Sequence, residues 1–296
     1  MRTFVKALVL ALLVLPIYSC SDDDDGAVVV GPTGNEKVFD LGSVSDPNIS
    51  GTATFIEMND GTTTIELQLS GTPDGGMHPA HIHFNTAAET GGIALSLGTV
   101  DGSTGLSTVT TRVLDMGDED PSNDTPISYD ELLDFDGYIN VHASADDLGT
   151  LVAQGDIGQN ELTGNSRSYA LNSVAFPTIS GTIEFEERAN GNTIATIMLT
   201  GTPDGGMHPA HIHAGSVAEA PGDILFTFKP VDGTTGISKT NMDMPYTDED
   251  DDDDNDGTED PITYSEILDF DGYVNVHLSS DDLGTLVAQG NIGANN

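Results

Sequence analysis

Basic residues are scarce in this chain. Lysine and arginine together number 8 against 49 aspartates and glutamates in 296 residues, which gives a formal net charge of −41. This charge repels phosphate backbones and anionic lipid headgroups and attracts divalent cations, so nucleic acid is excluded as a partner. Cysteine occurs once, at Cys20, and the chain therefore has no internal disulfide.

Long hydrophobic runs are also missing, apart from a short one near the N-terminus. Residues 7–15 are apolar, follow two basic residues and are too few to span a bilayer. Ser19 and Cys20 follow, an order that predicts a lipoprotein signal peptide over 1–19 and lipidation of Cys20. The alternative is an ordinary signal peptide with an incidental cysteine. Cleavage would leave 8 − 2 = 6 basic residues against 49 acidic ones, a charge of −43.

The predicted location is the bacterial outer membrane or cell surface, where acyl chains on Cys20 would tether the protein without crossing the membrane. Residues 20–36 begin with four aspartates, Asp22 to Asp25, and carry no apolar pattern, so we expect an acidic flexible tether. The acidic run resembles the export signal behind the lipidated cysteine of some Gram-negative surface lipoproteins. A block of charge that only solubilises the chain is the alternative.

Sequence patterns of common enzymes are absent as well. The chain contains no Gly-x-Ser-x-Gly, no phosphate-binding loop and no cysteine nucleophile, and no carboxylates are recognisably paired as acid and base. No catalytic residue is therefore predicted, and a binding function is favoured over an enzymatic one.

What the chain does have is an internal duplication. Gly71–His83 returns unchanged at Gly201–His213, and Leu133–His142 returns in near-identical form at Leu268–His277. We expect two related domains, which cover residues 37–160 and 167–296.

Alternating apolar and polar residues indicate strands, as in Thr64–Ser70. Asn59–Gly61 and Asn190–Gly191 are typical of hairpin turns, and only Tyr129–Leu133 and Tyr264–Leu268 have a short helical pattern. The predicted class is all-β, with two tandem Greek-key domains that are either β-sandwiches or barrels.

All eight histidines fall in the repeated segments. In His81-Ile82-His83 the two imidazoles share one face of a strand, and His142 shares a face with Tyr138 on a second strand. Three neutral nitrogens without a thiolate favour copper or zinc over calcium, with one ion in each domain. The predicted ligands are His81, His83 and His142 in the first domain and His211, His213 and His277 in the second.

His78 and His208 precede prolines, and each is predicted either as an additional ligand or as the donor of a hydrogen bond that fixes a turn. Met77 and Met207 are expected to pack, with soft copper ligation as the alternative. A second metal candidate is an acidic loop whose alternating carboxylates and Gly257 suit calcium. Its candidate ligands are Asp252, Asp254, Asp256 and Asp260. A solvated acidic loop without an ion is the favoured interpretation.

The repeated motifs resemble those of the chordin-type (CHRD) domain. Each unit has an early His-Ile-His, a late Gly-Tyr-Ile-Asn-Val-His or Gly-Tyr-Val-Asn-Val-His, and a closing Val-Ala-Gln-Gly. The resemblance extends over nearly the whole chain behind residue 36. It implies a β-sandwich and an extracellular location, and it implies no agreed activity.

A more distant resemblance is to copper/zinc superoxide dismutases. Gly-Met-His-Pro-Ala-His-Ile-His is similar to a segment of that family, and the resemblance implies copper ligation by the six predicted ligands and a structural role for His78 and His208. Leu151 and Leu286 stand where that family has its substrate-guiding arginine, and no histidine between His83 and His142 can serve as its bridging ligand. Gln154 and Gln289 replace its disulfide cysteine.

The leading interpretation is a surface lipoprotein of two domains that binds copper or zinc and acts as a binding or interaction module. The first alternative is a copper-only oxidoreductase similar to superoxide dismutase. The second is an adhesive or matrix protein in which the histidines bind no metal.

Overall fold

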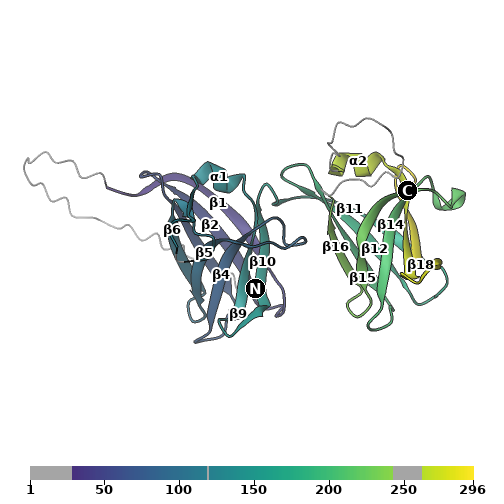
Figure 1. Cartoon of the computed structure of the whole chain (residues 1–296), viewed down its shortest axis with the longest axis horizontal. Helices are drawn as coiled ribbons and strands as arrows, with labels where there is room; N and C mark the ends of the chain where they lie inside the picture. Colours follow the sequence, from purple (N-terminus) through teal and green to yellow (C-terminus); the bar gives the residue numbers. More distant parts are fainter. Residues whose placement is uncertain (1–28, 119, 243–261) are drawn as a thin grey trace, which may run out of the picture. The chain divides into compact units, whose positions relative to one another are not determined.

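The computed structural model describes residues 29–118, 120–242 and 262–296. They form two closed antiparallel β-barrels of eight strands each, drawn in purple to teal and in green to yellow in Figure 1. The first barrel comprises β1 (Pro32–Ser43), β2 (Ser50–Met58), β3 (Thr63–Ser70), β4 (Met77–Phe84), β5 (Ile93–Asp101), β6 (Leu106–Thr111), β9 (Asp136–Ser144) and β10 (Asp147–Gly158). The second comprises β11 (Leu162–Ser173), β12 (Ser180–Arg188), β13 (Thr193–Thr200), β14 (Met207–Ala214), β15 (Ile224–Asp232), β16 (Ile237–Asn241), β17 (Asp271–Ser279) and β18 (Asp282–Gly293).

Both barrels have the same strand order. The first follows β1, β10, β9, β4, β5, β6, β3 and β2 around its circumference, and the second follows β11, β18, β17, β14, β15, β16, β13 and β12. Because β3 pairs with β6 while β4 lies between β5 and β9, two connections cross the barrel ends, as in a Greek key. The predicted all-β class and the duplicated domain are confirmed.

Alternating side chains place a core inside each barrel. In β3, Ile65, Leu67 and Leu69 are 1%, 1% and 2% exposed, whereas Glu66 and Gln68 face solvent. Burying one such apolar side chain fully stabilises a fold by about 1.5–3 kcal/mol. The buried residues form one cluster in each barrel, so each domain has its own core.

The helices of the described residues are short. The two α-helices, α1 (Tyr129–Leu133) and α2 (Tyr264–Asp269), begin where the sequence predicts, whereas the 3₁₀ turn η1 (Val217–Glu219) was not predicted. In α1 the Ser128 hydroxyl accepts a hydrogen bond from the amide of Glu131, whose carboxylate accepts one from the Ser128 amide. Thr263 and Glu266 make the same capping box in α2. These reciprocal bonds satisfy amides that have no partner inside a helix.

The predicted hairpin turns are also present. Asn59–Gly61 lies between β2 and β3, and Asn190–Gly191 lies between β12 and β13. Gly61 and Gly191 have φ angles of 79° and 85°, a region that a residue without a Cβ adopts at little cost. A further two-stranded sheet pairs β7 (Val113–Leu114) with β8 (Thr125–Pro126).

Each barrel begins earlier than the boundaries expected at residues 37 and 167. β1 starts at Pro32 and β11 starts at Leu162. The extra residues continue to pair across a register shift, where Glu57 of β2 accepts hydrogen bonds from Thr33 at 2.7 Å and from Asn35 at 2.8 Å. The last residues of the expected tether, from Pro32 onward, therefore belong to strand β1. Hydrogen bonds between polar side chains extend the pairing of β1 with β2 into this segment, which has no apolar alternation.

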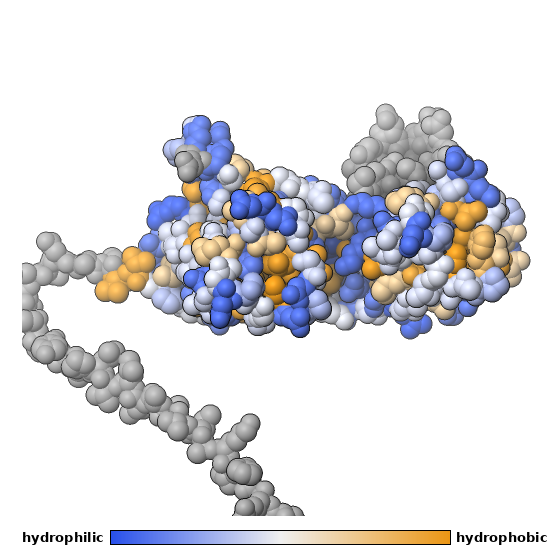
Figure 2. Space-filling view, turned by 90° about the horizontal axis from the view of Figure 1, so that it is seen from below, coloured by the Kyte–Doolittle hydropathy of each residue, from blue (hydrophilic) through white to orange (hydrophobic). Residues whose placement is uncertain are grey.

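The face of the molecule drawn in Figure 2 is mainly hydrophilic. On the face drawn in Figure 2, smaller hydrophobic areas lie between hydrophilic residues on both barrels. Among the residues that the structure describes, no helix has the length and apolar character needed to cross a membrane. Cys20 and the acidic loop with Asp252, Asp254, Asp256 and Asp260 lie outside the described residues.

Candidate metal centre

The three predicted ligands of the first domain come from β4 and β9, which are neighbours in the barrel. Ile82 of β4 and Val141 of β9 are 0% exposed and point into the core. The alternation of a strand then directs His81, His83 and His142 to the outer face of the barrel.

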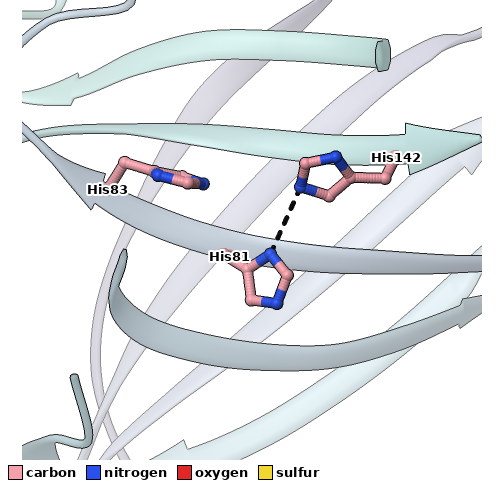
Figure 3. Close-up of side chains that lie close together, drawn as sticks. All are labelled: His81, His83 and His142. Carbon is pink, nitrogen blue, oxygen red and sulfur yellow. Dashed lines mark hydrogen bonds between the residues drawn. The ribbon is translucent and has the colours of Figure 1, made fainter. Parts of the chain in front are cut away.

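These three imidazoles converge on one point, as Figure 3 shows. Nδ1 of His81 lies 3.3 Å from Nε2 of His142. One nitrogen from each of the three rings lies within 4.8 Å of the others, a separation that suits ligands of a single ion. The ring centroids of His81 and His83 are 5.9 Å apart.

The second barrel repeats this arrangement on β14 and β17. Nδ1 of His211 lies 3.1 Å from Nε2 of His277, and His213 completes a cluster with the same 4.8 Å limit. The centroids of His211 and His213 are also 5.9 Å apart. All three side chains are at most 8% exposed, whereas His81 and His83 are half-buried.

Backbone carbonyls orient two of the three rings in each cluster. The Nδ1–H of His142 donates to the carbonyl of Leu148 at 2.7 Å, and the Nδ1–H of His83 donates to the carbonyl of Gly91 at 3.0 Å. A neutral imidazole with its proton on Nδ1 has a free lone pair on Nε2, so both rings present Nε2 as the ligand atom. The second barrel repeats these bonds, from His277 to Leu283 at 2.7 Å and from His213 to Gly222 at 2.9 Å.

The donor atoms fit a metal ion. Nε2 of His83 and Nε2 of His213 are buried and have no hydrogen-bond partner within the described part of the chain, and the same is true of Nε2 of His78 and His208 outside the clusters. Leaving such a nitrogen unsatisfied is unfavourable by about 1–3 kcal/mol, a cost that ligation removes. One Nδ1 and two Nε2 atoms therefore form a donor set in each barrel.

Burial favours the neutral form of four of the six rings. Loss of hydration lowers the pKa of His81, and His142 and His83 lower it further, while Asp115 partly opposes them. Burial likewise lowers the pKa values of His83 and His277, and it lowers the pKa of His211 to about 4. Because a ligand imidazole must be unprotonated, these shifts favour metal binding at neutral pH.

His78 and His208 belong to neither cluster. They are 3% and 1% exposed and lie on the inward face of their strands. The Nδ1–H of His78 donates to the carbonyl of His142 at 3.1 Å, and that of His208 donates to the carbonyl of Leu278 at 2.9 Å. The two histidines were predicted either as ligands or as hydrogen-bond donors that fix a turn. In the structure each makes a hydrogen bond, but the bond joins two strands and does not close a turn.

Met77 and Met207 do not pack as expected. They are 56% and 51% exposed, because alternation along β4 and β14 turns them outward. Leu151, at the position of the arginine in the resemblance, is the strand partner of His142 in the β9–β10 ladder. Leu286 has the same place opposite His277.

Tyr138 and Tyr273 complete the surroundings of the two sites in a way that the sequence did not reveal. Tyr138 stacks on His83 with centroids 5.0 Å apart and an interplanar angle of 20°. Tyr273 stacks on His213 at 5.2 Å and 18°. The repeated Gly-Tyr pair at the start of β9 and β17 was the available signal, but strand alternation alone gives no stacking partner.

No family model matches this chain, and no curated protein or solved structure matches it either. Its function is therefore inferred from the two sites. Each described cluster holds three imidazoles and neither a thiolate nor a carboxylate. Nitrogen donors of this kind suit copper and zinc, whereas calcium and magnesium require oxygen ligands.

Proposed function

We propose that this protein is a two-domain metal-binding module that holds one copper or zinc ion in each barrel. The observation that carries the proposal is the pair of matching histidine clusters, in each of which three ligand nitrogens lie within 4.8 Å of one another. Depressed imidazole pKa values and two buried Nε2 atoms without partners support it. Copper(II) binds such sites more tightly than zinc in the usual order of stability, and availability decides between them.

The experiment is equilibrium dialysis of the mature protein against copper or zinc, followed by metal analysis. We expect two equivalents for the unchanged protein, one for His81→Ala or His211→Ala, and none for the double variant. Met77→Leu and Met207→Leu are matched controls on the same strands and should retain two. Absence of bound metal in the unchanged protein would overturn the proposal and favour the adhesive alternative.

A copper oxidoreductase is the second candidate. Three imidazoles leave a coordination position of copper without a protein ligand, and His81 and His83 are only half-buried. However, Leu151 lies opposite His142, and the chain is too acidic to attract superoxide. We expect the copper-loaded protein to remove superoxide no faster than free copper.

Leu151→Arg would supply the missing cation beside the site and should raise the rate above that of the unchanged protein. A rate in the unchanged protein far above that of free copper, abolished by His81→Ala with His211→Ala, would require the enzymatic function in place of the binding one.

We further propose that the units are chordin-type domains and that acyl chains on Cys20 anchor them at the cell surface. The motif resemblance and the apolar run before Cys20 support this placement. Cys20→Ala should move the protein from the membrane fraction to the soluble fraction with both barrels folded. Retention of that variant in the membrane fraction would contradict the anchor.

A further inference from the structure

We infer that Tyr138 and Tyr273 are positioning residues that fix the orientation of one metal ligand in each barrel. This inference rests on the proposed metal-binding function and adds to it a specific pair of side chains. Neither tyrosine is a ligand. Each acts through the neighbouring histidine, His83 or His213, by two contacts that occur in both barrels.

The first contact is the aromatic stack. His83 and Tyr138 are direct partners in the β4–β9 ladder, and His213 and Tyr273 are direct partners in the β14–β17 ladder. Their rings are nearly parallel, with angles of 20° and 18°. Tyr138 is 2% exposed and Tyr273 is 0% exposed, so the phenol rings are held by the surrounding chain and limit rotation of the imidazoles about χ2.

The second contact runs through a glycine. The amide of Gly91 donates to the hydroxyl of Tyr138 at 3.2 Å, and the carbonyl of the same glycine accepts from Nδ1–H of His83 at 3.0 Å. In the second barrel Gly222 makes the two bonds at 2.9 Å each, to Tyr273 and His213. The phenol thus holds the residue that fixes the tautomer of the ligand.

Only glycine fits at the positions of Gly91 and Gly222. A Cβ on Gly91 would lie 2.0 Å from the carbonyl oxygen of Phe84, and one on Gly222 would lie 2.0 Å from that of Ala214. The loop and the phenol together therefore hold Nε2 of the histidine in one direction.

The matched control is a second pair of duplicated tyrosines. Tyr129 and Tyr264 are 8% and 9% exposed, start α1 and α2, and belong to the hydrophobic cores. They have the same residue type, the same duplication and similar burial as Tyr138 and Tyr273, and they stack on no histidine of the clusters. Substituting Tyr129 and Tyr264 therefore measures the effect of changing a buried tyrosine that does not contact a candidate ligand.

The experiment uses three double variants of the mature protein. One carries Tyr138→Phe and Tyr273→Phe, a second carries Tyr138→Leu and Tyr273→Leu, and the control carries Tyr129→Phe and Tyr264→Phe. We expect the first double variant to bind two copper(II) ions with affinity lowered about tenfold and an altered electron paramagnetic resonance spectrum. The leucine variant, which also loses the stack, should be affected more. The control should retain the affinity and the spectrum of the unchanged protein.

Nitrogen NMR of the metal-free protein gives a second measurement. The Nδ1–H protons of His83 and His213 should exchange slowly with water in the unchanged protein and in the control, and faster in both variants. Unchanged affinity, spectrum and exchange in Tyr138→Phe with Tyr273→Phe would overturn the inference. If the unchanged protein binds no copper, the proposed function fails, and the exchange rates still decide whether the tyrosines position the imidazoles.

Discussion

The three histidines of β4 do two different things, although they stand within six residues of one another. His81 and His83 face outward toward a shared point, while His78 faces inward and bonds to the backbone of β9. The difference follows from strand alternation, because 81 and 83 share a parity that 78 does not. From residue type alone, all three histidines would be predicted as metal ligands.

The pH dependence of the metal-free protein follows from the depressed pKa values. In the unfolded chain imidazoles titrate near pH 6.5, whereas burial lowers the pKa values of His81, His83 and His277 and brings that of His211 to about 4. Below pH 6.5 the unfolded chain therefore binds more protons than the folded one. The free energy of unfolding should be greatest above pH 6.5 and should decrease as the pH falls toward 4.

Urea denaturation of the metal-free protein over this pH range measures the effect. His211→Asn removes the most strongly shifted group and should give a shallower dependence. The loaded protein should retain its metal at pH 6, where a free imidazole would already be largely protonated. Complete metal loss at pH 6 would contradict the neutral state assigned to the ligands.

His78→Ala tests the inward histidine. The substitution removes a side chain that is 3% exposed and leaves the carbonyl of His142 without its 3.1 Å donor. We expect the free energy of unfolding to fall by about 2–4 kcal/mol, from the lost packing and hydrogen bond together. Metal analysis of the folded variant should still give two equivalents. One equivalent would instead assign His78 as a ligand.

At the scale of elements, periodicity predicted which faces of the strands carry histidine, but it did not predict which strands are neighbours. His81 and His83 share a face by sequence alone, and so do Tyr138 and His142. That β4 lies beside β9 depends on the Greek-key crossovers, which tertiary packing determines. The stack of Tyr138 on His83 depends on this pairing and was therefore not predictable.

Strand ends were also beyond prediction. The pairing of β1 before residue 37 depends on bonds from Thr33 and Asn35 to Glu57. A polar stretch of this kind has no apolar alternation to mark it, and the partner is distant in sequence. The short helices were predictable because their caps and apolar residues are local.

The capping boxes provide a test at this scale. Ser128→Ala and Thr263→Ala each remove the hydroxyl that accepts from the third helical amide, and each should lower the free energy of unfolding by about 1 kcal/mol. Urea denaturation checks this value. Ser45→Ala, at an exposed position between β1 and β2, is the control and should change it by less than about 0.5 kcal/mol. Equal effects in all three would contradict a capping role.

At the scale of the whole molecule, duplication gives two cores and two histidine clusters in one acidic chain. Each barrel has its own buried cluster and its own three histidines, so one site does not require the other. The net charge of −41 favours the approach of divalent cations to both. We therefore expect the two sites to be filled independently.

X-ray absorption at the metal edge of the copper- or zinc-loaded protein tests the three-histidine centre most directly. The expected result is a first shell that includes three imidazole nitrogens at about 2.0–2.1 Å for zinc, with the multiple-scattering pattern of histidine and two ions per chain. His83→Ala with His213→Ala should remove the histidine pattern from any metal that remains bound. A first shell made of oxygen alone in the unchanged protein would place the metal on surface carboxylates and contradict a histidine centre.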